Sequence, residues 1–237
     1  MSDQIPQIKV PFKAPEQKFV PYDWNNFKSD PLYLSIFGKF PWLPKSEEAT
    51  LSEKEQQIKQ KVQEIQGKLK PDLPKLSDEF VEKVVILAEE LKCSPEDLLA
   101  IMYHESGGWD PSIVAKDKRG RILYGGLIQM NKTSLRVVAD KYADELNLKE
   151  NISMNEYLRL PREKQIDYAK GYFTLLKDTC NLDNKKHLTA GETWGMLKSP
   201  RLTKARNQRF LNKLDNFVEN IKKKIFVQEG QHLNVKN

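Results

Sequence analysis

The sequence predicts an all-α fold with at most a minor β-hairpin, and three observations favour this class. Between residues 77 and 225, apolar residues recur at steps of three and four, which is the spacing of one helix face. Helix start signals, each a Ser, Thr or Pro followed by acidic residues, precede most of these segments. Neither a repeat nor an alternation of strand and helix patterns is present.

The first 50 residues differ in composition from the rest and are predicted to form an extended arm. Seven prolines between residues 6 and 44 exclude long helices there. Nine aromatic residues in the same stretch are more than a typical disordered tail carries. We interpret the segment as an arm that wraps its own domain or docks on a partner. The alternative is a flexible tail with exposed aromatic side chains.

Residues 51–74 are predicted to form an amphipathic helix and a linker. A capping box formed by Ser52 and Glu55 predicts that the helix begins at Ser52. Its narrow apolar stripe consists of Leu51, Ile58, Val62, Ile65 and Leu69. The prolines at 71 and 74 end the helix and mark the best domain boundary in the chain.

The main domain is predicted at residues 75–227, with a tail at 228–237. The expected helices follow Ser77, run from Pro95 to Glu105 and from Lys132 to Leu146, follow Ser153, Pro161 and Thr189, and span Lys204 to Lys224. A short hairpin is expected at residues 119–124, with its turn at Gly120.

The net charge of the chain indicates only a broad class of binding partner. The chain has a formal net charge of +6, so acidic polymers such as bacterial wall, nucleic acid or anionic membrane surfaces would be attracted. The basic runs at 116–121 and 221–225 lack a nucleic-acid-binding motif and are interpreted as solvated faces. The apolar runs fall far short of the roughly 20 residues that a membrane span needs, and no secretory signal pattern opens the chain.

Neither a cofactor nor a metal is predicted. The chain contains three histidines without metal-ligand spacing. Its two cysteines, Cys93 and Cys180, lack the CxxC spacing and are interpreted as partly buried free thiols, with a disulfide between them as the alternative.

Glu105 is the sharpest candidate for chemistry. The helical spacing places it on the same side as Leu98 and Met102, so it shares the inward face. It also ends the helix immediately before a loop with two glycines. A carboxyl group between an apolar helix and a polar loop can act as a general acid. The alternative is an ordinary solvated surface residue.

Two motifs around Glu105 carry a family resemblance. HESGGWDPSIV at residues 104–114, followed by YGGLIQMNKTS at 124–134, resembles the lytic transglycosylases and goose-type lysozymes of the lysozyme-like superfamily. In those families a helix ends in a catalytic Glu followed by Ser, and a Gly-Leu-x-Gln signature follows a loop. The similar region spans residues 77–176, which is under half of the chain. The resemblance implies a lysozyme-like helical domain.

The resemblance also implies cleavage of the β-1,4 bond between N-acetylmuramic acid and N-acetylglucosamine in peptidoglycan. Glu105 would protonate the glycosidic oxygen and then take the proton of the C6 hydroxyl, which closes a 1,6-anhydro ring without water. Ser106 would position the acid or the sugar. Gly126 and Gln129 belong to the second motif, and Gln129 would hydrogen-bond the substrate.

The sequence departs from the family pattern downstream. Many members carry Ala-Tyr-Asn-Ala-Gly, whose Tyr bonds the catalytic Glu, and this chain lacks it. Tyr168 and Tyr172 are candidates to face Glu105, and Trp194 is a candidate to line the cleft, with a core position as the alternative for each. His104, adjacent to Glu105, is expected to point to a different helix face without a role.

A hydrolytic mechanism with activated water would favour a second carboxylate. Asp110 and Asp117 lie in the loop after Glu105 and are candidates, although both are more simply explained as turn residues.

The expected partner is therefore peptidoglycan, at the bacterial wall. Without a signal sequence, delivery by a phage virion or tail, by a holin or by a secretion apparatus is expected, with residues 1–70 as the docking segment. The rival hypothesis is a structural protein that keeps the fold for assembly or wall binding and has lost activity.

Overall fold

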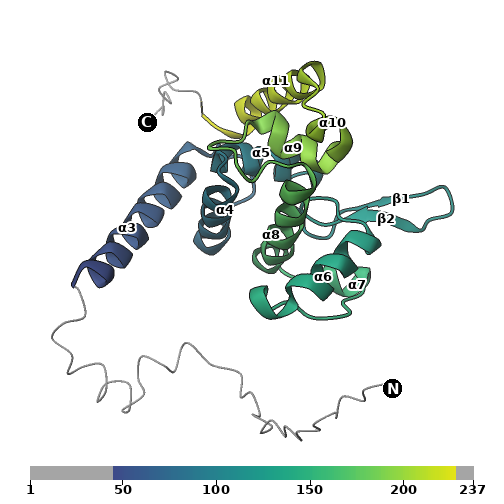
Figure 1. Cartoon of the computed structure of the whole chain (residues 1–237), viewed down its shortest axis with the longest axis horizontal. Helices are drawn as coiled ribbons and strands as arrows, with labels where there is room; N and C mark the ends of the chain where they lie inside the picture. Colours follow the sequence, from purple (N-terminus) through teal and green to yellow (C-terminus); the bar gives the residue numbers. More distant parts are fainter. Residues whose placement is uncertain (1–44, 228–237) are drawn as a thin grey trace, which may run out of the picture. The chain divides into compact units, whose positions relative to one another are not determined.

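The computed structural model describes residues 45–227, and these confirm an all-α fold with one small hairpin (Figure 1). The helices are α3 (Lys45–Lys68), α4 (Asp78–Leu91), α5 (Pro95–Glu105), α6 (Lys132–Leu146), α7 (Met154–Tyr157), α8 (Arg162–Thr179), α9 (Ala190–Lys198), α10 (Pro200–Lys204) and α11 (Gln208–Ile225). The strands are β1 (Val114–Lys116) and β2 (Ile122–Gly125). The predicted arm up to residue 44 and the predicted tail lie outside the described residues.

Helix α3 begins earlier than expected. It starts at Lys45, so the prediction that Ser52 caps it was wrong. The sequence after Pro44 is rich in good helix formers, so the helix forms before it reaches the capping box.

The second half of α3 packs on the domain that was predicted to begin at residue 75. Ile58, Val62 and Ile65 are buried in the same core as the later helices. The backbone after α3 also pairs with the end of α11, because Lys70 N–H donates to the carbonyl of Ile225 at 3.0 Å.

Most helix starts were correctly predicted, because a side chain accepts a hydrogen bond from a backbone N–H three residues ahead. Ser77, Ser94, Ser153 and Thr189 all cap in this way, and Asn131 does the same for α6. Helix α8 packs against α4 and α6, and its buried side chains include Ile166, Ala169, Phe173 and Leu176.

The long helix predicted from Lys204 begins four residues later, at Gln208. Helix α10 ends at Lys204, and Arg206 takes a left-handed conformation with φ of 51°. The side chain of Asn207 then accepts a hydrogen bond from Phe210 N–H at 3.0 Å and starts α11. This cap sets the start of α11, which contains the whole predicted apolar stripe from Phe210 to Ile225. Helix α11 packs on both α5 and α9.

The hairpin of β1 and β2 forms close to its predicted position and projects from the helices (Figure 1). The strands are antiparallel, with Val114 opposite Gly125 and an irregularity between Ala115 and Lys116. The Asp117 carboxylate accepts hydrogen bonds from the backbone N–H groups of Arg119 at 2.8 Å and Arg121 at 2.9 Å. Asp117 therefore stabilises the turn.

Both cysteines are buried free thiols, as the sequence interpretation favoured. Burial raises the pKa of Cys93 to about 12 and also raises the pKa of Cys180. Thiolate is the reactive form, so alkylation of Cys93 by iodoacetamide at pH 8 is expected to be about a thousandfold slower in the folded protein than in urea. Peptide mass spectrometry after timed labelling measures both rates. Rapid labelling of the folded chain would contradict this prediction.

None of the helices among residues 45–227 combines the length and apolar character that a membrane crossing requires.

Candidate active site

Glu105 ends α5 with its carboxylate turned inward, as the helical period predicted. Its side chain is 6% exposed. Oε1 accepts a hydrogen bond from the indole Nε1 of Trp194 at 2.6 Å. The Lys198 ammonium lies 2.7 Å from Oε1 and 3.0 Å from Oε2. Both partners come from α9, where a spacing of four residues places them on one face.

The Glu105 carboxylate borders a pocket of about 350 Å³. Three segments besides α5 form its walls: the hairpin, the loop after β2 and the last turn of α9. Their lining residues are Ala115, Tyr124, Ile128, Gln129, Leu197 and Lys198. A concave site with a few convergent polar groups on apolar walls is typical of small-molecule and sugar binding.

The second motif forms the loop at residues 125–130. Its ends are paired, because Gly125 and Met130 exchange backbone hydrogen bonds at 3.0 and 2.9 Å. Gly126 has φ of +79°, and a Cβ there would lie 2.6 Å from both Gln165 Oε1 and a ring carbon of Tyr157. Glycine is therefore required by the backbone, and Gly126 is buried and does not line the pocket.

Gln165, which sequence reasoning missed, holds this loop in place. Its buried side chain accepts a hydrogen bond from Leu127 N–H at 3.0 Å. Its amide donates to the carbonyl oxygens of Pro111 at 2.8 Å and Tyr157 at 3.0 Å. Gln165 therefore ties both ends of the hairpin region to α8. Gln129 lies at the pocket wall, and its amide donates to the carbonyl of Gly126 at 3.0 Å.

Three candidate substrate-binding residues do not face the pocket. Ser106 is fully buried, and its hydroxyl donates to the carbonyl of Met102 at 2.6 Å. The Tyr168 hydroxyl accepts from Lys149 N–H at 3.0 Å, and the Tyr172 hydroxyl accepts from the hydroxyl of Ser134 at 3.2 Å. These contacts correct the expectation that Ser106, Tyr168 or Tyr172 meets Glu105 or a sugar, because each hydroxyl is engaged elsewhere in the fold.

Trp194 is a core residue, but its indole N–H reaches Glu105. Its ring packs against Phe217 at 5.1 Å and against His104 at 5.2 Å between centroids. His104 therefore packs against Trp194, and it does not line the pocket. Burial lowers the pKa of His104, so its ring is neutral at pH 7 in this cluster.

Neither Asp110 nor Asp117 lines the pocket. The Asp110 carboxylate accepts from the N–H and hydroxyl of Ser112 at 2.8 and 2.7 Å, and Asp117 holds the hairpin turn. Both aspartates are turn residues, as the simpler interpretation held. Among the residues that line this pocket in the described part of the chain, Glu105 is the only carboxylate.

The hydrogen bonds around Glu105 determine whether its carboxyl group can donate or accept a proton in this arrangement. An ammonium and an indole N–H are donors only. Both carboxylate oxygens therefore act as acceptors, and a proton on Oε2 would find no acceptor at Lys198. Glu105 is placed to accept a proton, and it can donate one only after Lys198 has moved away.

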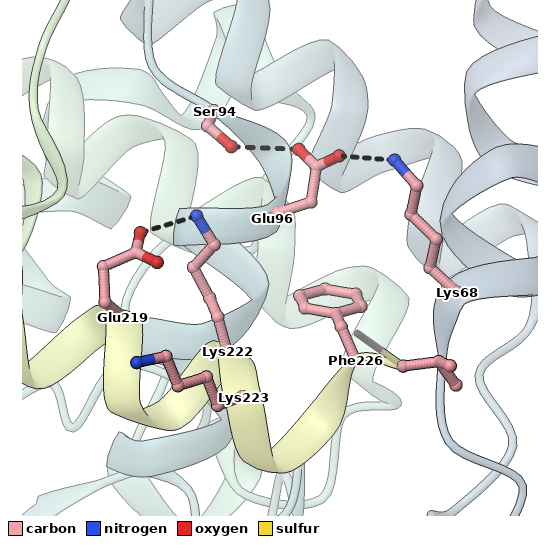
Figure 2. A pocket seen from close by; sticks show the side chains of 8 residues that line it. Lys68, Ser94, Glu96, Glu219, Lys222, Lys223 and Phe226 are labelled. Carbon is pink, nitrogen blue, oxygen red and sulfur yellow. Dashed lines mark hydrogen bonds and ion pairs between the residues drawn. The ribbon is translucent and has the colours of Figure 1, made fainter. Parts of the chain in front are cut away.

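A larger pocket of about 670 Å³ lies at the opposite end of α5 and is lined mainly by charged side chains. Figure 2 shows Ser94 and Lys68 directed at Glu96, and Lys222 directed at Glu219. Glu96 is bonded by the hydroxyl of Ser94 at 2.9 Å and lies 3.9 Å from the ammonium of Lys68. Lys222 pairs with Glu219 at 2.8 Å. Because most of these charges are paired with one another, this pocket is a weaker candidate than the one at Glu105.

No protein-family model matches the sequence, and comparisons with curated proteins and with solved structures also find no match. The resemblance to lytic transglycosylases and goose-type lysozymes consequently rests on the two motifs and their order in the chain.

Proposed function

We propose that this protein cleaves the glycan strands of peptidoglycan as a lytic transglycosylase with a lysozyme-like domain, and that Glu105 is its acid and base. One observation carries the proposal. The carboxylate on which both motifs converge is buried at the wall of a pocket, and Trp194 holds it from a helix far along the sequence. The indole N–H donates a hydrogen bond to the carboxylate, which is the interaction that the tyrosine hydroxyl makes in the family pattern.

In the proposed reaction, the carboxylic acid of Glu105 donates its proton to the glycosidic oxygen as the bond from that oxygen to the muramic acid C1 breaks. The C6 hydroxyl oxygen of the same sugar then bonds to C1, and the Glu105 carboxylate takes the hydroxyl proton. The carboxyl group returns to its starting form, and the products are an anhydro-muramic end and a free 4-hydroxyl. Gln129, at the pocket wall, would hydrogen-bond the sugar.

The pocket favours this route over hydrolysis. An inverting glycosidase needs a second carboxylate to activate water, and a retaining enzyme of the usual kind needs one as the nucleophile. In the described part of the chain, the lining of this pocket offers Glu105 alone. A hydrolytic goose-type activity is the second outcome that the test distinguishes.

Mass spectrometry of muropeptides released from purified sacculi tests the proposal. We expect products with a 1,6-anhydro-muramic end, which are lighter by one water than hydrolytic products. Reducing ends would assign the chain to hydrolysis. Release of neither product would contradict glycan cleavage altogether.

The Lys198–Glu105 ion pair supports one alternative, a protein in which Glu105 is a structural ion-pair partner without catalytic activity. In that case the chain would bind peptidoglycan or a virion or secretion component. A pull-down of host or phage proteins by the full chain and by a chain without residues 1–44, which keeps α3 in the core, tests that part of the proposal. Equal recovery would contradict docking through residues 1–44.

A further inference from the structure

Lys198 is the pocket residue that the proposed reaction leaves unexplained. Its ammonium lies against both oxygens of Glu105 and 5.5 Å from the centre of the Trp194 ring. The rest of the side chain is accessible, with 42% exposure. While the pocket is empty, the Lys198 ammonium pairs with the Glu105 carboxylate. Glu105 must be released from this pair before it can donate a proton.

The charges of the pocket show what Lys198 would bind when it leaves Glu105. Among the described residues that line the pocket, Lys198 is the only cation and Glu105 the only anion. An anionic ligand would be repelled by Glu105 unless Lys198 turned toward it. A neutral ligand would gain nothing from Lys198 and would leave the ion pair with Glu105 in place.

We propose that Lys198 determines specificity by binding a carboxylate of the substrate, and that this exchange frees Glu105. The inference rests on the proposed function and names its substrate class: glycans that carry a carboxylate close to the scissile bond, as opposed to neutral N-acetylglucosamine polymers. In peptidoglycan, the lactyl group of muramic acid carries a free carboxylate on strands without a stem peptide. Where a stem is amide-linked to that group, the carboxylates of the stem itself take its place. As the ammonium moves to the substrate carboxylate, the Glu105 carboxylate takes up a proton from solvent and becomes the acid that the proposed reaction needs. No unpaired charge is then left in the pocket.

Binding of two uncleaved disaccharides tests the inference without relying on catalysis. The first is N-acetylglucosaminyl-β-1,4-N-acetylmuramic acid with a free lactyl carboxylate, whose glycosidic bond is not the type that the proposed reaction breaks. The second is neutral chitobiose. The ratio of their dissociation constants, measured by NMR titration, reports recognition of the carboxylate alone.

We expect the parent protein to prefer the anionic disaccharide by about tenfold, as for a hydrogen bond between charged groups. Lys198→Met should abolish the preference and bring the ratio to one or below, because Glu105 then repels the carboxylate of the anionic disaccharide. A circular dichroism spectrum like that of the parent shows that the variant is folded. Glu105→Gln should raise the preference above that of the parent, because Lys198 no longer has a competing partner. Opposite effects from two adjacent partners are not expected of a merely structural ion pair.

Lys170→Met is the matched control, because it removes one positive charge from a partly exposed ion pair, with Glu90, away from the pocket. It should keep the parental ratio. The inference is overturned if the parent binds both disaccharides equally or binds neither, or if Lys198→Met retains the preference. If the protein released no muropeptide in the sacculus assay, the proposed function would be contradicted. The binding measurement would still show whether Lys198 recognises a carboxylate.

Discussion

Replacement of Glu105 by glutamine is expected to lower the rate of glycan cleavage by about a thousandfold, which is within the usual contribution of a general acid. Glutamine has nearly the same shape and keeps an oxygen that can accept the Trp194 hydrogen bond. It cannot donate the acidic proton or take the proton of the C6 hydroxyl. Soluble muropeptide released from purified sacculi over time measures the rate.

Glu96→Gln provides a matched control for this variant. Glu96 lies at the opposite end of the same helix, is largely buried and pairs with Lys61 at 3.2 Å. Its replacement removes one negative charge from α5 without touching the pocket at Glu105, so cleavage should continue at the parental rate. If Glu105→Gln cleared sacculi as fast as the parent, Glu105 would not be the acid.

Replacement of Gly191 by alanine is expected to destabilise the fold by about 2 kcal/mol. Gly191 lies where α9 crosses α11, and its N–H donates to Asp215 at 2.5 Å. A Cβ there would overlap the Leu211 carbonyl oxygen and lie 2.9 Å from Asp215 Cγ. Since the neighbouring atoms include backbone, the two helices must separate. Because α9 carries Trp194 and Lys198, this separation would also displace the partners of Glu105.

Gly67→Ala is the opposite case and the control. Gly67 lies in α3, and a Cβ there would meet no atom within 4 Å. Alanine at this helical position should stabilise the protein by about 0.5–1 kcal/mol. In thermal unfolding followed by circular dichroism, Gly191→Ala should lower the Tm by about 4–8 °C, and Gly67→Ala should raise it slightly. Equal melting of Gly191→Ala and the parent would show that the helices do not pack as closely as described.

The sequence predicted most local structure because the interactions responsible lie within one helical turn. The caps at Ser77, Ser94 and Thr189 each bond a backbone N–H three residues away, so the residue pattern alone identifies them. The errors arose where local signals compete. The helix around Ser52 had an earlier start available, and the Asn207 cap starts α11 later than the predicted Lys204.

The candidate site was predicted only in part. The apolar period of α5 correctly predicted that Glu105 lies on the inward face. The motif at 125–130 correctly predicted that Gln129 lies at the candidate site. Ser106 was misassigned because proximity in sequence suggested proximity to a ligand, whereas its hydroxyl bonds back to its own helix. Tyr168 and Tyr172 have the right residue type, but α8 directs their hydroxyl groups to Lys149 and Ser134.

The sequence by itself determined that this protein is helical, where most helices begin, and that Glu105 faces inward. Only the tertiary structure decided which groups meet that carboxylate. Trp194 and Lys198 lie 89 and 93 residues further along the chain and reach it because α9 packs beside the end of α5. No local pattern specifies such a contact, since it depends on how several helices pack around one core.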